Sequence, residues 1–308
     1  MPKRDYFGLA IDFLKQRDEH NLERSATQTL YYLNCWIRDE IADPRWMIDR
    51  PLINTLPLAI RKAPATEELT SDGALSRMQF NAGDIMFLEE ARWLHAVAQT
   101  VTERPQDRAL GDWIKPTQLS RKAGRDLAAC YALFDWTVRS IQLDELKPYP
   151  KQTAAGPVSR AEANSRFANW PPPLRGVPGP GYEGCPWHTL LYGHGDMYQR
   201  ARVFILLARQ LHIDAVMLGI DTKGGRAQPW LPAVLLDGQL FLFDIGLGLP
   251  VPGPGNTGIA TLEQVIEDPN LLASLDVGER YRYPVRQTDL DKVVAMLDAS
   301  PEYLAQRM

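Results

Sequence analysis

Apolar residues recur at helical spacing through the first 140 residues of the chain. Between Leu22 and Asp43 they step by four, three, four and four positions, which places them on one face of a helix. These positions are Ala26, Leu30, Leu33, Ile37 and Ile41. The same spacing predicts helices over Asp5–Arg17 and Gly124–Ser140. Asn81 is a suitable N-cap for another helix that runs to about Val101.

Residues beyond 195 combine helices with short strands. The amphipathic segment Asp196–Leu211 predicts a helix, and Asp289–Leu297 predicts another. Three short apolar runs predict strands, namely Ile213–Ile220, Leu231–Leu236 and Gln239–Asp244. Asp237-Gly238 joins the last two runs and is typical of a type I′ hairpin turn, in which both central residues need a positive φ. We therefore expect an α+β fold, with a helix packed on an antiparallel sheet.

A segment rich in proline and glycine separates these two patterns. It covers residues 147–186 approximately and holds nine of the chain's 24 prolines. Proline lacks a backbone N–H and fixes φ, so the segment favours neither a helix nor a central strand. We predict a helical N-terminal domain over residues 1–122. A second domain over residues 123–308 carries the segment as an insertion.

The composition excludes several classes of protein. Hydrophobic residues make up 45% and charged residues 23%, close to the globular average. The net charge of −4 argues against a nucleic-acid partner, and no uncharged apolar run is long enough for a membrane span. The start of the chain lacks the apolar stretch of a signal peptide. As it stands the chain is expected in the cytoplasm, or secreted or periplasmic if a signal has been removed.

Few residues carry recognisable chemistry. The cysteines, at positions 35, 130 and 185, are too scattered for a disulfide framework or a zinc site. The glycines after Asp244 match no phosphate-binding loop. We expect no cofactor and no metal. Asp196 and Gln199 have capping-box spacing and follow His194, which lies in a glycine-flanked turn. A helix start of this kind is where enzymes place a nucleophile or bind an anion.

Three segments resemble the core of the transglutaminase-like superfamily, a cysteine-protease-like or papain-like scaffold. Residues 201–216, ARVFILLARQLHIDAV, look like the central helix of that family and the strand after it. Residues 228–244, QPWLPAVLLDGQLFLFD, look like its next two strands. Residues 132–141, ALFDWTVRSI, are similar to the helix that precedes the core. The chain before Gly124 has no part in the resemblance.

The resemblance implies a catalytic triad of cysteine, histidine and aspartate. The matching positions hold Met197, Gln228 and Asp244. A thioether has no proton to lose and an amide is no general base near neutral pH, so two of the three groups are missing. We therefore expect a catalytically degenerate protein that binds a protein or peptide, or acts as a scaffold. Its expected groove contains Met197, Gln228 and Trp230, with His194 and Asp196 as further candidates.

Two enzymatic alternatives remain open. In one, His194 with Asp196 or Asp244 forms a histidine–carboxylate pair that performs hydrolysis or acyl transfer without a cysteine. In the other, Cys185 is a thiol nucleophile. Either enzyme predicts an accessible histidine within hydrogen-bond distance of a carboxylate. A third alternative is a helical interaction protein whose proline-rich segment is a docking arm.

Overall fold

The computed structural model describes most of the chain, and the described part divides into two compact units. The described residues are 5–16, 22–38, 40, 45–56, 58–103, 108–114, 119–144, 186–222, 226–278 and 281–308. Unit 1 comprises residues 1–93 and 299–308, and unit 2 comprises residues 94–298. The predicted insertion at about 147–186 therefore lies almost wholly outside the described residues.

Unit 1 is built from helices. They are α1 (Tyr6–Lys15), α2 (Leu22–Ile37), α3 (Arg50–Asn54), α4 (Leu58–Arg61), α5 (Pro64–Leu69), α6 (Asp72–Leu75) and the first part of α7 (Ala82–Thr102). Helices α1 and α2 pack on each other and share a core with Phe80 and Ile85. Asn81 accepts hydrogen bonds from the N–H groups of Gly83 and Asp84, which confirms the predicted cap of α7.

The C-terminal segment of the chain belongs to unit 1 and ends in a buried ion pair. Arg307 donates from Nε and Nη2 to the two carboxylate oxygens of Asp84, both at 2.7 Å. Its Nη1 donates to the carbonyl oxygen of Ala74 at 3.0 Å. The two side chains are 6% and 0% exposed. The last residues thus anchor themselves at the first turn of α7.

Unit 2 contains a five-stranded antiparallel sheet with the order β6-β5-β4-β3-β7. Its strands are β3 (Ala215–Thr222), β4 (Arg226–Leu236), β5 (Gln239–Asp244), β6 (Leu249–Pro250) and β7 (Val293–Met296). Asp237 and Gly238, between β4 and β5, have φ values of 48° and 79°, as the predicted type I′ hairpin requires. The sheet and its helices confirm the α+β class.

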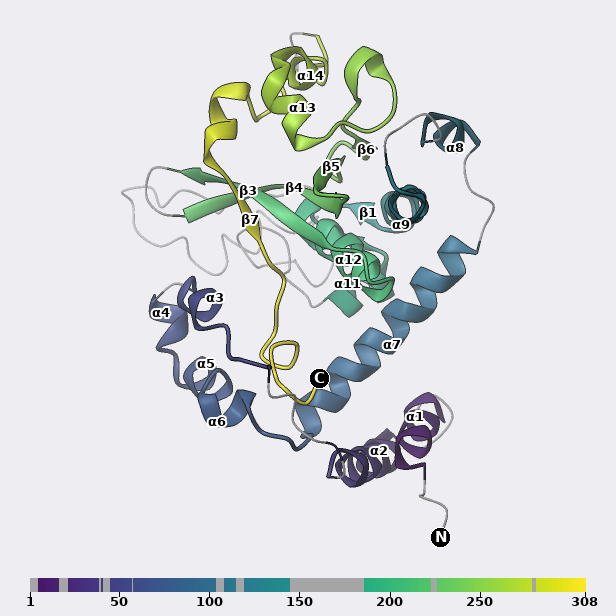
Figure 1. Cartoon of the computed structure of the whole chain (residues 1–308), viewed down its shortest axis with the longest axis vertical. Coiled ribbons are helices and arrows are strands. Elements are labelled where there is room, and N and C mark those ends of the chain that lie inside the picture. The colour runs from purple at the N-terminus through teal and green to yellow at the C-terminus, as the bar shows by residue number, and fades with distance from the viewer. Residues whose placement is uncertain are drawn as a thin grey trace, which may run out of the picture. The chain divides into compact units, whose positions relative to one another are not determined.

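Helices cover both faces of this sheet (Figure 1). One face packs on α9 (Arg121–Ser140) and α12 (Met197–Gln210), and the other on α13 (Leu262–Glu267) and α14 (Pro269–Ala273). The described residues of unit 2 also form α8 (Arg108–Ile114), β1 (Gln142–Leu143), α11 (Pro186–Tyr192), β2 (His194–Gly195) and the 3-10 turns Pro254–Asn256 and Gln287–Lys292. Phe134, Phe204 and Phe243 join α9, α12 and β5, with ring centroids 5.2–5.8 Å apart. The predicted central helix therefore packs on the sheet.

One helix of the sequence analysis is not found in the structure. The helix expected over Asp289–Leu297 is wrong, because a 3-10 turn is followed by strand β7. Val293 pairs there with Ile220 at an edge of the sheet, where β-branched residues are favoured. The units divide between residues 93 and 94, whereas the expected domain boundary lies at 122/123. The second part of α7 supplies Leu94 and Ala98 to the core of unit 2.

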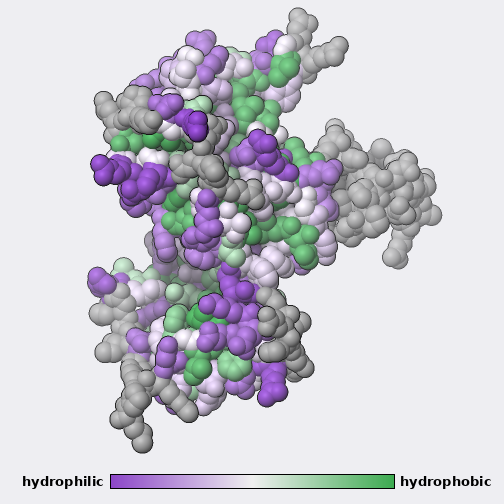
Figure 2. All heavy atoms as spheres, turned by 90° about the vertical axis from the view of Figure 1, so that its right-hand side faces the viewer, coloured by the Kyte–Doolittle hydropathy of each residue, from purple (hydrophilic) through white to green (hydrophobic). Residues whose placement is uncertain are grey.

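The surface of the described part carries scattered apolar side chains. Examples in unit 2 are Leu191, Tyr192, Val277 and Leu297, which are more than half exposed. Figure 2 shows one face, on which apolar and hydrophilic residues are interspersed. None of the described helices is both long enough and apolar enough to cross a membrane.

Candidate functional site

A capping box fixes the start of α12. Asp196 Oδ1 accepts hydrogen bonds from the N–H groups of Tyr198 and Gln199 at 2.8 and 2.9 Å. Gln199 Oε1 accepts in return from the N–H of Asp196 at 2.9 Å. This confirms the predicted cap, and the 4% exposed carboxylate of Asp196 stabilises the positive end of the helix dipole. Met197 is then the first residue of the helix.

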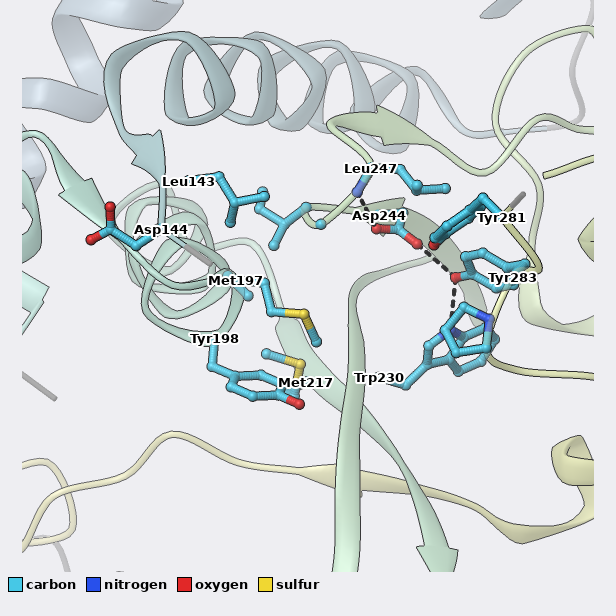
Figure 3. Close-up of a pocket in the computed structure, with 14 residues that line it drawn as sticks. Leu143, Asp144, Met197, Tyr198, Met217, Trp230, Asp244, Leu247, Tyr281 and Tyr283 are labelled. Carbon is cyan, nitrogen blue, oxygen red and sulfur yellow. Dashed lines mark hydrogen bonds between the residues drawn. The ribbon is translucent and has the colours of Figure 1, made fainter. Parts of the chain in front are cut away.

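A cavity of about 280 Å³ lies beside this helix start. Met197, Tyr198 and Met217 lie on one side of it, and Trp230 and Asp244 on the other (Figure 3). The helix N-terminus and three strands therefore contribute to one site. Two of the three positions matched to the family triad, Met197 and Asp244, line it together.

Gly246 keeps the space between Met197 and Asp244 open. A Cβ atom at this glycine would lie 3.3 Å from Asp244 Oδ1 and 3.7 Å from Met197 Sδ. The first distance is tighter than most contacts of real Cβ atoms. The backbone of Gly246 thus forms part of the cavity wall. The side chain of any larger residue would project into the space between Met197 and Asp244.

Trp230 reaches the cavity because of an irregularity in β4. Leu218 pairs with Leu231 and Gly219 pairs with Pro229, so Trp230 is an extra residue in this strand. A β-bulge of this kind interrupts the alternation of side chains between the two faces of a sheet. Trp230 and its neighbour Leu231 accordingly belong to the same buried cluster.

A chain of hydrogen bonds closes one wall of the cavity. Trp230 Nε1 donates to Tyr283 Oη at 2.8 Å, and Tyr283 Oη donates to Asp244 Oδ2 at 2.6 Å. Asp244 Oδ1 accepts from the N–H of Leu247 at 2.8 Å. The side chains that form these hydrogen bonds are buried, since Tyr283 is 2% exposed and Asp244 is 7% exposed. Both oxygens of Asp244 are therefore already engaged.

Burial shifts the acidity of groups at this site and in the neighbouring core. Burial raises the pKa of Tyr283 far above its ordinary value of 10.0, and the nearby charge of Asp244 raises it further. Burial also raises the pKa of Cys130, a core residue of α9. Tyr283 therefore supplies no anion near neutral pH, and Asp244 is the acidic side chain of this wall.

Gln228 is the matched position that the structure does not bring to the cavity. It pairs with Ile220 in β3, its side chain is exposed, and it is not among the lining residues. The bulge at Trp230 explains the separation, since positions on either side of it no longer follow one alternation. The expected groove of Met197, Gln228 and Trp230 is thus reduced to Met197 and Trp230.

His194 has a carboxylate partner that the sequence analysis did not identify. Its Nδ1 lies 2.6 Å from Oδ2 of Asp144, and the two side chains are 37% and 28% exposed. Strands β1 and β2 hold the pair together, because Asp144 N donates to the Gly195 carbonyl at 2.8 Å. The expected partners, Asp196 and Asp244, make other contacts instead.

Asp144 and Tyr283 carry no local signal in the sequence. Asp144 is 50 residues from His194, and Tyr283 is 39 residues from Asp244. Asp144 lines the cavity at the end opposite Asp244 (Figure 3). Cys185, the alternative nucleophile, lies outside the described residues. Within the described ranges, no three histidine, cysteine or acidic residues are grouped so as to hold a metal ion.

Comparison of the chain with protein-family models, with curated proteins and with solved structures found no match. The similarity to transglutaminase-like proteins therefore remains a prediction, based on the sequence segments quoted above.

Proposed function

We propose that this chain is a catalytically inactive binding protein on a transglutaminase-like scaffold. Its cavity at the start of α12 receives a side chain of a protein or peptide partner. The observation that carries the proposal is that Met197 and Asp244 both line the cavity and both lie close to Gly246. The position expected for a reactive thiol holds a thioether, and the carboxylate expected to orient a histidine accepts from Tyr283 instead.

The size and lining of the cavity support binding of a single small group. At about 280 Å³ it lies near the lower limit of typical ligand pockets. Its wall is largely apolar, and the two methionines Met197 and Met217 adapt readily to different shapes. A cavity of this kind accepts one side chain, while the rest of a peptide contacts the surrounding surface.

The first experiment asks whether the cavity takes amino-acid side chains. The protein is labelled with [methyl-¹³C]methionine, and signals are assigned with Met197→Leu and Met217→Leu. N-acetyl amino acid amides with apolar, aromatic and basic side chains are the probes. At least one is expected to shift both methyl signals in a saturable manner.

Gly246→Leu tests whether the probe binds in the cavity, because the leucine side chain would occupy the space beside Met197. Gly111→Leu is the matched control, because a Cβ at Gly111 of α8 meets no atom within 4 Å. Binding is expected to disappear in the first variant and persist in the second. Binding that survives Gly246→Leu, or no binding of any probe, contradicts the proposed site. Transamidation of a glutamine peptide that iodoacetamide abolishes contradicts the absence of catalysis.

A second candidate function is hydrolysis that depends on the pair of His194 and Asp144. The 2.6 Å contact and the partial exposure of both side chains favour it. His194 would take a proton from water, which attacks an ester carbonyl, and return that proton to the departing alkoxide. Hydrolysis of p-nitrophenyl acetate tests this candidate. If this candidate is correct, the protein hydrolyses the ester, the rate falls in His194→Gln, and the rate is unchanged in the control His188→Gln.

A further inference from the structure

The cavity wall combines aromatic rings with negative charge. Its aromatic residues are Tyr198, Trp230, Tyr281 and Tyr283, and its charged residues are Asp144 and Asp244. None of the 14 lining residues is a lysine, arginine or histidine. Aromatic faces attract cations through the ring quadrupole, and carboxylates do so directly. The lining therefore favours a positively charged group.

Asp244 supplies a negative charge that no basic side chain of the described residues neutralises. Its hydrogen-bond donors are the hydroxyl of Tyr283 and the N–H of Leu247, which are both neutral. At 7% exposure this carboxylate is also screened only weakly by water. A buried charge is normally paired, so an opposite charge from a ligand would complete the site.

Arginines near the site are directed at other acceptors. Arg200 of α12 donates to the carbonyl of Val138 at 2.8 Å, near the C-terminal end of α9, where the helix dipole is negative. Arg286 and Arg282 both pair with Asp276. Asp144 pairs with His194, so Asp244 is the carboxylate of the cavity wall for which the described residues supply no basic partner.

The start of α12 does not reverse this polarity. A helix N-terminus carries a partial positive charge that favours anions. Here the carboxylate of Asp196 accepts from the N–H groups of Tyr198 and Gln199. The full negative charge of the cap exceeds the partial charge of the dipole, so the helix start adds no anion site.

We infer that the side chain received by the cavity ends in a methylated ammonium group, as in trimethyllysine. This inference rests on the proposed function and names the chemical class of its ligand. A quaternary ammonium has no N–H group that needs an acceptor. Its methyl groups can make apolar contacts with the side chains of Met197 and Met217, which line the cavity. A primary ammonium has three N–H donors, and the oxygens of Asp244 already accept from Tyr283 and Leu247.

The experiment compares two probes of nearly equal shape on the unchanged protein. One is N-acetyl-trimethyllysine amide, and the other is its neutral isostere, in which carbon replaces the quaternary nitrogen. The methyl signals of Met197 and Met217 report binding at the cavity itself. Because cation–π attraction in a desolvated site is worth a factor of about ten or more in affinity, the charged probe is expected to bind at least tenfold more tightly. Unmethylated N-acetyl-lysine amide is expected to bind more weakly than the trimethylated probe.

The outcomes separate this inference from the proposed function. Equal or tighter binding of the neutral isostere overturns the inference and leaves a cavity that binds apolar side chains. Equal or tighter binding of unmethylated lysine overturns the preference for methylation. No shift with any amino-acid probe overturns the proposed function as well.

Asp244→Asn supplies a second test, because it removes the charge and nearly preserves the shape. The preference for the charged probe is expected to fall several-fold in this variant. It is expected to persist in Asp221→Asn, which changes the charge equally at an exposed position of β3 outside the cavity lining. An unchanged preference in a folded Asp244→Asn protein contradicts the assigned role of this carboxylate. The probe comparison on the unchanged protein holds even where that variant does not fold.

Discussion

Replacing Arg307 with methionine tests the ion pair that anchors the C-terminal segment in unit 1. The change removes two hydrogen bonds of 2.7 Å to Asp84 and one of 3.0 Å to the Ala74 carbonyl. Asp84 is 0% exposed and would lose its side-chain donor Arg307, with the N–H of Asn81 among the groups that still donate to it. Breaking one side of a buried pair costs about 3–5 kcal/mol. Single domains are stable by about 5–15 kcal/mol, so unit 1 is expected to lose much of its stability.

Urea unfolding followed by circular dichroism measures this loss, and hydrogen exchange at the first turn of α7 locates it. The double variant Asp84→Leu with Arg307→Met is expected to regain much of the stability, because it leaves no unpaired charge. The control is Lys122→Met, which breaks the exposed pair with Asp126 and is expected to change stability within experimental error. If Arg307→Met is no more destabilising than this control, the argument from burial is wrong.

Three further predictions concern unit 2. Because burial raises the pKa of Tyr283, its contribution to stability is complete below the ordinary tyrosine pKa of 10.0 and is lost as the pH rises above it. Tyr283→Phe should make the alkaline decline in the free energy of unfolding, measured with urea, shallower by about 1.4 kcal/mol per pH unit, and an unchanged slope contradicts this. Burial also raises the pKa of Cys130, so this thiol should not react with Ellman's reagent at pH 8 while the protein is folded. The parent protein and Cys130→Ala should therefore show the same number of reactive thiols when folded, and the variant should show one fewer after unfolding. Asp237 accepts from the N–H and hydroxyl of Ser120 at 2.6 and 3.0 Å, so Asp237→Gly should cost about 0.5–1.5 kcal/mol in thermal unfolding, while Asp237→Asn should cost less.

Local chemistry explains why much of the fold could be predicted from the sequence. Asn81 caps α7 and Asp196 caps α12 with acceptors that lie within three residues of their donors. Asp237-Gly238 forms its turn because two adjacent residues adopt positive φ values. In each case the residues that decide the structure are neighbours in the chain, so their spacing is sufficient.

Interactions between distant segments explain the errors. Val293 and Val294 form a strand only because the edge of β3 is available to them, and nothing within Asp289–Leu297 specifies that edge. The boundary between the two units falls within α7, and it depends in the same way on where Leu94 packs. The site shows this most clearly, since Trp230 meets Tyr283 across 53 residues of sequence.

The hydrogen bonds of Asp244 support the proposed binding function without depending on which residue is matched to the nucleophile. Moving the match by a few residues would change the residue assigned to the nucleophile. It would not change the donors to Asp244, which are Tyr283 and Leu247. A triad requires this carboxylate to orient an imidazole, and His194 is instead paired with Asp144. The proposed binding function thus has support from two separate observations, the thioether of Met197 in the cavity lining and the hydrogen bond from Tyr283 to Asp244.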